Sequence, residues 1–260
     1  MRGLVWFRND LRLHDNEALH YAAQQCDELL CVYCIDLREF EETTYGFTKT
    51  GPFRIQFLLE TLEQLKASLQ AIGGELLVCI DTPENIIPQL LTEHQIDRLY
   101  FQHQAGTEEA ETAGHITRYC EANEVQVHIT QGASLFHIDD IPFTLEKLPN
   151  IFTEFRKATE KNSTVRPVFP APQLLKPIKV DGANEIPSAS DLGYTLPKPD
   201  PRAAIRFKGG ETAAMQRLQH YFWETQSLKE YKETRNCMLG ADYSSKFSPW
   251  LALGCISPRT

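Results

Sequence analysis

The sequence is short of features that place a chain in a membrane or outside the cell. Its 260 residues contain no apolar run near the roughly 20 residues that a membrane span needs. The start, MRGLVWFRNDLRL, carries charges too early for a signal peptide. The seven cysteines are odd in number and scattered, which is typical of reduced, buried thiols rather than of a disulfide framework. We therefore expect a soluble, cytoplasmic protein with no membrane segment.

Three common cofactor and metal motifs are also missing. There is no GxGxxG after a strand and no GxxxxGK[ST], which excludes the ordinary dinucleotide fingerprint and the P-loop enzymes. The eight histidines show no zinc-type pairing. The one CxxC pair, Cys31 and Cys34, lies in a run typical of a strand, where residues three apart point to opposite faces. We interpret the pair as core packing and predict no metal site.

The net charge of −9 conceals an asymmetry along the chain. Residues 201–260 carry nine Lys or Arg and five Asp or Glu, whereas residues 1–200 carry seventeen and thirty. A basic C-terminal segment on an acidic body allows a phosphate-bearing partner at that end only. Chance clustering on a solvated surface explains the same charges equally well.

The first 131 residues alternate between short apolar runs and longer amphipathic segments. Such alternation implies right-handed crossovers and a parallel sheet covered on both faces, with ligands at the carboxyl ends of its strands. The predicted fold class is α/β, a doubly wound five-stranded parallel sheet. We predict strands at 3–7, 28–36, 75–79, 98–102 and 125–130, and helices at 16–25, from Pro52 to the pair Gly73–Gly74, at 83–94 and at 108–123.

Beyond residue 131 the composition changes. Residues 165–201 hold eight of the fifteen prolines, which helices and central strands tolerate poorly. We therefore predict a semi-extended connector over 132–202. Helical spacing returns at Glu211, so residues 203–260 are expected to begin a second, helical domain.

The most polar segment, WFRNDLRLHDN at 6–16, follows the first predicted strand at the edge where ligands bind. One interpretation is a network of Arg–Asp pairs and an Asn or Asp helix cap that ties this loop to a neighbouring domain. The other is direct catalysis or ligand contact. We favour the network.

A second polar segment, YSSKFSPW at 243–250, combines hydroxyls, a lysine and a helix start. Ser248 before Pro249 fits an N-cap and a first helical residue. Free N–H groups, Lys246 and the helix dipole would then converge, as in a phosphate or pyrophosphate site. The alternative is a capped surface helix that happens to lie near a lysine.

The segment YKETRN at 231–236 adds basic and aromatic groups just upstream. Arg235 could contact a nucleic-acid phosphate, and Tyr231 could stack or form a hydrogen bond. An exposed helix with pairs of opposite charge is the other interpretation. The spacing of the charges does not decide between the two.

Several motifs together resemble the photolyase/cryptochrome family, and in particular its DASH branch. They are VWFRNDLRLHDN near the start, KTGPFR at 49–54, FKGGET at 207–212, and YKETRN…GADYSSKFSPWLALGCISPR at 231–259. The resemblance follows the whole chain in order. It implies an α/β antenna domain at 1–131, a connector at 132–202 and the beginning of a helical FAD-binding domain at 203–260.

The resemblance also implies an activity and its site. The activity is light-driven, FAD-dependent repair of cyclobutane pyrimidine dimers in DNA, preferentially single-stranded DNA, by a monomer. Unstacking a damaged base from a single strand is easiest, which fits that preference. By resemblance, FAD is contacted along its pyrophosphate and ribityl side by Ser244, Ser245, Lys246, Phe247 and Ser248 and at its phosphates by Tyr231, while Arg235 meets the DNA backbone.

Two departures from the family qualify these expectations. The glutamate that helps to hold the folate antenna, methenyltetrahydrofolate, is expected at the position of Ala105, so binding of that antenna would rely on other groups. The chain also ends at Thr260, about half the family's usual length. We therefore expect an N-terminal part that is inactive alone, with its catalytic residues beyond residue 260. The alternative is a stand-alone α/β binding or interaction module without photochemistry.

Overall fold

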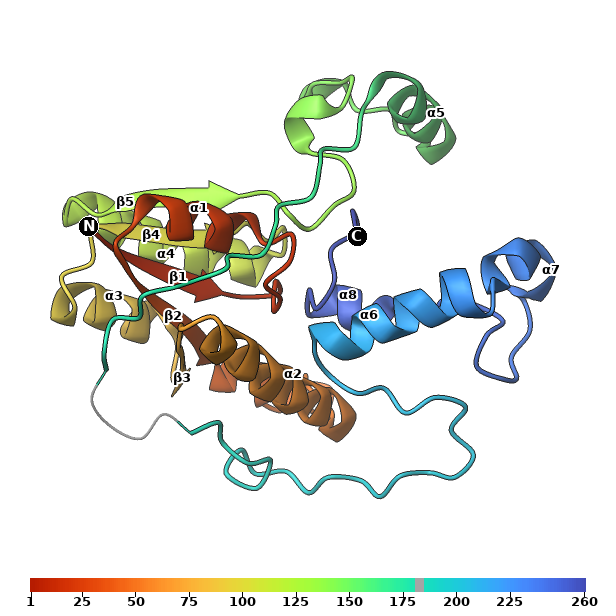
Figure 1. Cartoon of the computed structure of the whole chain (residues 1–260), viewed down its shortest axis with the longest axis horizontal. Helices are drawn as coiled ribbons and strands as arrows, with labels where there is room; N and C mark the ends of the chain where they lie inside the picture. The colour runs from red at the N-terminus through yellow and green to blue at the C-terminus, as the bar shows by residue number, and fades with distance from the viewer. Residues whose placement is uncertain (181–184) are drawn as a thin grey trace.

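A five-stranded parallel sheet forms the centre of the computed structural model, which describes residues 1–180 and 185–260 (Figure 1). The strand order is β3-β2-β1-β4-β5, so it reverses between β1 and β4. Loops that leave the carboxyl ends of these two strands meet at the switch point, where ligands of such sheets bind. The strands are β1 (Arg2–Phe7), β2 (Glu28–Ile35), β3 (Leu76–Ile80), β4 (Arg98–Gln102) and β5 (Gln126–Thr130).

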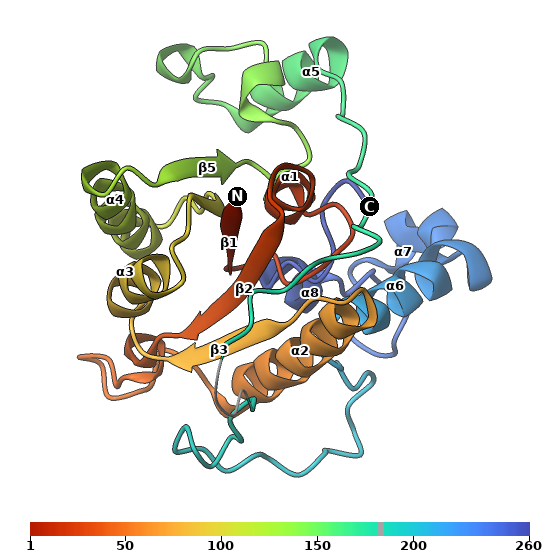
Figure 2. The same cartoon turned by 60° about the vertical axis from the view of Figure 1, so that its left-hand side comes forward.

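Helices cover both faces of the sheet (Figure 2). The helices α1 (Glu17–Gln25) and α2 (Pro52–Ala71) pack on one face, and α3 (Pro83–Glu93) and α4 (Thr107–Ala122) pack on the other. Each face has its own apolar core, because alternate residues of a strand point to opposite sides. The predicted doubly wound α/β sheet is therefore confirmed.

Local sequence explains where the helices begin and end. Gly51 precedes Pro52 at the start of α2, and the helix stops before Gly73, which has a φ of +79°. The amide of Gly74 donates to the carbonyl of Leu69 at 2.8 Å, which closes the last turn. The strands and helices of the sheet domain agree with their predicted ranges to within one residue, except that α2 ends at Ala71, two residues before Gly73.

The predicted connector contains a helix that the sequence analysis missed. The helix α5 (Phe152–Asn162) lies away from the sheet, and residues 150–166 are free of proline, so its formation is physically reasonable. Downstream the chain is extended, and the amide of Ile178 donates to the carbonyl of Leu29 at the start of β2. Residues 181–184 of the predicted connector lie outside the described residues. Short 3₁₀ turns occur after β2 at Leu37–Phe40, and in the connector at Ile138–Asp140 and Leu145–Lys147.

The C-terminal segment is helical, as predicted, and its first helix lies beside the sheet domain (Figure 1). Buried residues of α6 and α8 join the core shared by α1 and α2. No helix in the described ranges is long and apolar enough to cross a membrane. The elements are α6 (Glu211–Gln219), a π turn at His220–Glu224, a 3₁₀ turn at Ser227–Glu230, α7 (Tyr231–Thr234) and α8 (Ser248–Ala252).

Candidate functional site

The polar loop after β1 joins the α/β domain to the C-terminal helices. We call this contact the junction: residues 10–16 with Glu211 and residues 253–259. Asp15 is fully buried there and pairs with Arg259 at 2.6 Å, and it also accepts a hydrogen bond from the hydroxyl of Ser257. Arg12 is buried as well and donates to the carbonyls of Asp15 and Gly254, both at 2.9 Å. Charges buried in this way need partners, and here they have them.

Two glycines let backbones approach closely around the junction. Gly254 has a φ of +65°, and a Cβ there would lie 2.1 Å from the carbonyl oxygen of Asn9. Gly209 packs on α2, where a Cβ would lie 2.3 Å from the carbonyl oxygen of Phe57. Both positions therefore require glycine, since a side chain would force the two segments apart.

Glu211 completes the junction from the first turn of α6. Its carboxylate accepts hydrogen bonds from the amides of Leu13 at 2.8 Å and His14 at 3.0 Å, and burial raises its pKa. Asn16 caps α1 by accepting from the amide of Leu19 at 3.0 Å. Most of the 6–16 segment therefore forms the network that the sequence analysis favoured.

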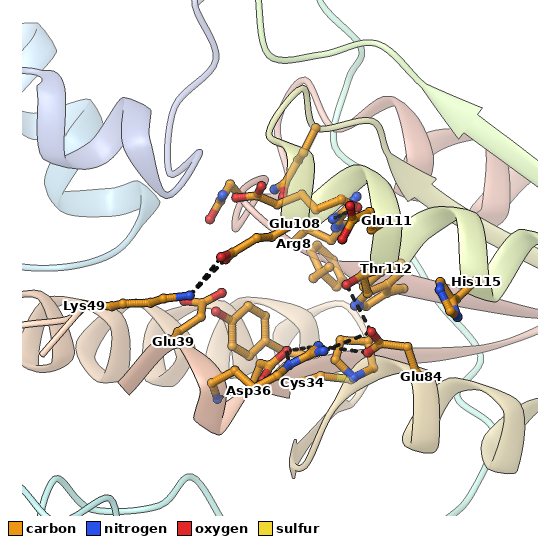
Figure 3. A pocket seen from close by; sticks show the side chains of 18 of the residues that line it. Arg8, Cys34, Asp36, Glu39, Lys49, Glu84, Glu108, Glu111, Thr112 and His115 are labelled. Atoms are coloured by element: carbon orange, nitrogen blue, oxygen red, sulfur yellow. Dashed lines mark hydrogen bonds and ion pairs between the residues drawn. The ribbon is translucent and has the colours of Figure 1, made fainter. Parts of the chain in front are cut away.

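Arg8 and Trp6 instead line a cavity at the carboxyl ends of β1 and β2 (Figure 3). The guanidinium of Arg8 lies 4.6 Å from the centre of the Trp6 ring and donates to the carbonyl of Glu109 at 2.9 Å. The cavity has a volume of about 490 Å³. Its remaining walls come from the loops after β2 and β4, from Lys49, and from the N-terminal parts of α3 and α4.

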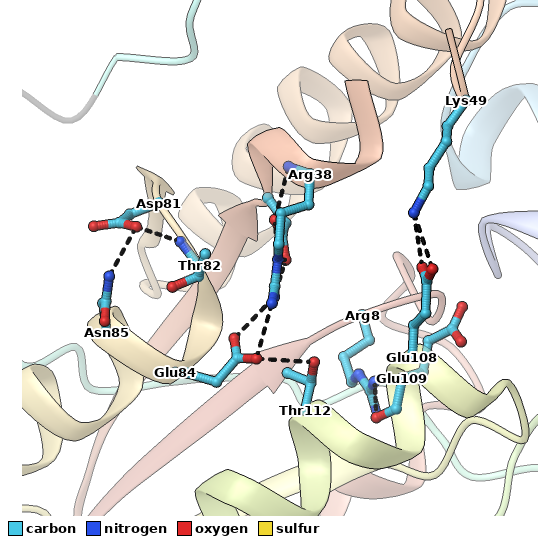
Figure 4. A network of polar contacts seen from close by, with 11 residues as sticks. Arg8, Arg38, Lys49, Asp81, Thr82, Glu84, Asn85, Glu108, Glu109 and Thr112 are labelled. Atoms are coloured by element: carbon cyan, nitrogen blue, oxygen red, sulfur yellow. Dashed lines mark hydrogen bonds and ion pairs between the residues drawn. The ribbon is translucent and has the colours of Figure 1, made fainter. Parts of the chain in front are cut away.

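The charged side chains around this cavity pair with one another across it (Figure 4). Arg38 contacts Asp36 and also Glu84 of α3, the latter at 2.9 Å, while Lys49 contacts Glu108 of α4 at 2.9 Å. Glu84 and Glu108 occupy helical first turns, where the helix dipole would otherwise attract an external anion. Further carboxylates line the same space, and they are Glu39, Glu41, Glu109 and Glu111. The lining is therefore poorly suited to a phosphate group.

The CxxC pair lies at the two faces of β2, as predicted. Cys31 belongs to the core under α1 and α2, and Cys34 to the core under α3 and α4. Burial raises the pKa of the Cys31 thiol to about 12 and holds that of Cys34 well above its ordinary value. Protonated thiols on opposite faces cannot bind one metal ion together or form a disulfide.

The loop from Ala241 to Ser248 is organised by Arg217, a buried residue of α6. The Arg217 guanidinium donates to the carbonyls of Ala241 at 2.9 Å, Ser244 at 3.1 Å and Ser245 at 3.0 Å. It also pairs with the carboxylate of Asp242 at 2.7 Å, and this contact contributes to the lowered pKa of Asp242. One side chain thus holds one side of the loop backbone.

The opposite side of this loop presents free amides. Among the described residues, no acceptor receives a hydrogen bond from the amides of Ser244, Ser245, Lys246 or Phe247. Lys246 has a φ of 56° and Phe247 has right-handed helical angles, an alternation that turns successive amides to one side. The ammonium of Lys246 lies 3.6 Å from the centre of the Tyr243 ring. Free amides beside a lysine are suited to an anion such as a phosphate.

The predicted N-cap at Ser248 is wrong in detail. The helix α8 begins at Ser248 itself, Phe247 occupies the cap position, and no side chain caps the helix. The reason is tertiary: Phe247 packs against Tyr221 and Phe222, and this holds the loop in a turn that already enters the helix. With only five residues, α8 adds little dipole of its own.

The structure brings α7 next to this loop. The hydroxyl of Thr234 in α7 donates to the carbonyl of Tyr243 at 3.0 Å. Tyr231 and Arg235, at the two ends of this short helix, are both exposed. All the residues predicted to contact FAD or DNA therefore lie between Tyr231 and Ser248 of the C-terminal segment, and none of them belongs to the junction.

Ala105 lines a second, smaller cavity between the sheet domain and α8, with a volume of about 260 Å³. Glu109 is the one acidic residue in its lining, which otherwise includes Arg12 and Gln102. Ala105 itself offers no polar atom beyond its backbone. The cavity wall therefore has no side-chain carboxylate at position 105, where the family resemblance implies a glutamate.

Sequence reasoning missed several residues on which the junction and the Ala241–Ser248 loop depend. Arg217 was not singled out, because it is one charge within a helix and its loop partners lie 24 to 28 residues away. Gly209 and Gly254 carried a detectable signal, because both fall within motifs that resemble the photolyase/cryptochrome family. The meaning of that signal, a close backbone approach, needed the structure.

Comparison with known proteins covers nearly the whole chain. It is 45% identical to a cryptochrome DASH of Gloeobacter violaceus over 98% of its length and 44% identical to one of Danio rerio over 97%. It spans 51% and 49% of those two proteins, about half the length of the relatives it matches.

Solved structures agree with the sequence matches. All of this chain superposes on 54% of a Synechocystis cryptochrome with a TM-score of 0.93 and 43% identity. A class III photolyase from Agrobacterium tumefaciens matches 99% of the chain, which covers 51% of that protein, with a TM-score of 0.81 and 26% identity. Residues 3–173 match the DNA photolyase family. The chain therefore belongs to the DNA photolyase family, and it is similar over nearly all of its length to cryptochrome DASH proteins.

Proposed function

We propose that this chain is part of a light-driven, FAD-dependent DNA photolyase of the cryptochrome DASH kind. Its substrate would be DNA that contains cyclobutane pyrimidine dimers, preferentially single-stranded DNA. The observation that carries the proposal is the row of amides at Ser244–Phe247 that have no acceptor among the described residues, in a chain similar to cryptochrome DASH proteins over nearly all of its length.

The geometry of the loop fits the diphosphate of FAD. The amides of Ser245 and Lys246 would donate to phosphate oxygens, and the Lys246 ammonium adds positive charge. The hydroxyls of Ser244 and Ser248, the Phe247 backbone and Tyr231 would complete this side of the site. FAD, when bound, supplies the light-driven one-electron chemistry, and this part of the chain orients it.

DNA would approach the same C-terminal unit. Residues 201–260 have a net positive charge, whereas residues 1–200 have a net negative charge. Arg235 is exposed within this positive segment. A guanidinium at this position would contact a backbone phosphate and would contribute to a salt-dependent affinity for DNA. A dimer in a single strand costs least to unstack, which supports the proposed substrate preference.

A folate antenna is not part of the proposal. The predicted position of its glutamate is Ala105, and the cavity that Ala105 lines offers Glu109 as its one carboxylate. The cytoplasmic location and the monomeric state remain predictions from the sequence.

Spectroscopy and a repair assay test the proposed function. The protein, purified at its natural length, should carry a flavin absorption spectrum and should repair a dimer-containing single-stranded oligonucleotide under blue light. Darkness is the control for the repair. A preparation that binds no flavin and repairs nothing would leave the alternative, a binding or interaction module without photochemistry. The 260-residue chain alone is expected to show little repair.

A further inference from the structure

Arg217 has a role that neither the motifs nor the family resemblance assigned to it. It lies in α6, its side chain is only 8% exposed, and it reaches the loop that follows α7. Three of its four polar contacts are to backbone carbonyls, those of Ala241, Ser244 and Ser245. A guanidinium can make several such bonds at once because its donors form a rigid fork.

The planarity of the peptide bond carries this arrangement to the other side of the loop. In a trans peptide the carbonyl oxygen of one residue and the amide hydrogen of the next point in opposite directions. Arg217 binds the carbonyls of Ser244 and Ser245, so the amides of Ser245 and Lys246 must point away from it. These are two of the amides that lack an acceptor among the described residues.

The charge of Arg217 is neutralised within the loop. Asp242 pairs with it at 2.7 Å and also lies 3.2 Å from a ring nitrogen of His220. The ring of Tyr221 lies 5.5 Å from the guanidinium carbon. Arg217 is thus enclosed by protein groups and would act on an anion through the loop backbone rather than by direct contact.

We propose that Arg217 is the positioning residue of the flavin site. By holding the carbonyls of Ser244 and Ser245, it presents the amides of Ser245 and Lys246 to the diphosphate of FAD. This inference rests on the proposed function of the loop as the FAD site.

The test compares two flavins, because riboflavin shares the ring and ribityl chain of FAD but has no phosphate. Apoprotein of natural length is titrated with each flavin, followed by flavin fluorescence. Arg217→Gln removes the charge and the fork, and we expect it to raise the Kd for FAD by about 30-fold while leaving the Kd for riboflavin within about threefold. Arg217→Lys keeps the charge but has only three donors for the four partners of Arg217 and lacks the rigid fork, so its Kd for FAD should rise by about tenfold.

The control is Arg206→Gln, which removes another arginine of the C-terminal segment from an exposed position and should leave both affinities unchanged. An equal loss of affinity for FAD and riboflavin would indicate general loosening and would overturn the proposal. Unchanged FAD affinity in Arg217→Gln would overturn it as well, although the protein could still be a flavoprotein. If Arg217→Gln does not fold, full FAD affinity in Arg217→Lys overturns the proposal, and a tenfold loss supports it. A wild type that binds no FAD would instead contradict the proposed function.

Discussion

The junction and the Ala241–Ser248 loop are both rich in polar groups, yet they differ in how far these groups are paired within the protein. At the junction, Asp15, Arg12 and Glu211 are paired with groups of the protein. In the loop, only the carbonyl side is paired, and the amide side faces outward without an acceptor among the described residues. A closed polar network stabilises a fold, whereas a half-satisfied one leaves binding capacity for a ligand.

Breaking the ion pair at the junction should have the largest effect. Arg259→Leu leaves the Asp15 carboxylate buried without its cation, so we expect the free energy of unfolding to fall by about 3–5 kcal/mol. Urea unfolding followed by circular dichroism measures this change. The control is Arg202→Leu, which removes an exposed pair with Asp200 and should cost less than about 0.5 kcal/mol. Equal losses in the two variants would contradict the closed junction.

Alanine substitutions at two glycines with positive φ distinguish the cost of backbone strain from the cost of steric overlap with a neighbouring segment. Gly254→Ala meets the Asn9 carbonyl at 2.1 Å and should cost about 3 kcal/mol or more. Gly240 also has a positive φ, of +93°, but a Cβ there would meet no atom within 4 Å, so Gly240→Ala should cost about 1 kcal/mol. Thermal or urea unfolding of both variants checks the difference. Similar costs would show that backbone strain alone, and not close approach, sets the requirement for glycine.

The two helix starts should respond differently to alanine. Asn16 caps α1 and also donates to the carbonyl of Asp10 at 3.0 Å, so Asn16→Ala should cost about 2 kcal/mol. Ser248 caps nothing, so Ser248→Ala should change the free energy of unfolding by less than about 0.5 kcal/mol. A cost near that of a true cap at Ser248 would restore the prediction made from the sequence.

The smallest expected effect is a pH dependence at Glu211. Burial raises the pKa of this carboxyl in the folded state, so the folded protein takes up its proton at a higher pH than the unfolded chain does. The wild type should therefore gain stability relative to Glu211→Gln as the pH falls from 7 towards the ordinary pKa of glutamate, about 4.3. Urea unfolding of both proteins at pH 7, 6 and 5 measures the difference. A relative loss of stability with falling pH would show that the hydrogen bonds from Leu13 and His14 outweigh burial.

Much of the α/β domain could be predicted because its signals are local. Apolar runs alternate with amphipathic segments, and Pro52 and Gly73 mark the ends of α2 where they were expected. The polar 6–16 segment could be placed at the functional edge of the sheet, and its role as a network was the favoured interpretation. The helix α5 was missed because the prolines beyond residue 165 dominated the interpretation of the whole connector.

The candidate site was only partly predictable. Its residues were predicted from hydroxyls, a lysine and a family resemblance and stay a prediction, whereas the N-cap assignment at Ser248 was wrong. Packing of Phe247 against two aromatic side chains decided where α8 begins, and local propensity does not contain that contact.

The sequence by itself determined the order and type of the sheet elements and indicated which loops are polar. Hydrophobic periodicity and turn residues act over a few positions, so they can be read along the chain. Only the tertiary structure decided which polar region pairs its charged groups within the protein and which keeps amides that have no acceptor in the described part of the chain. That outcome depends on Arg259 reaching Asp15 and on Arg217 reaching Ser244 and Ser245, contacts between residues far apart in sequence whose geometry arises only when the elements pack.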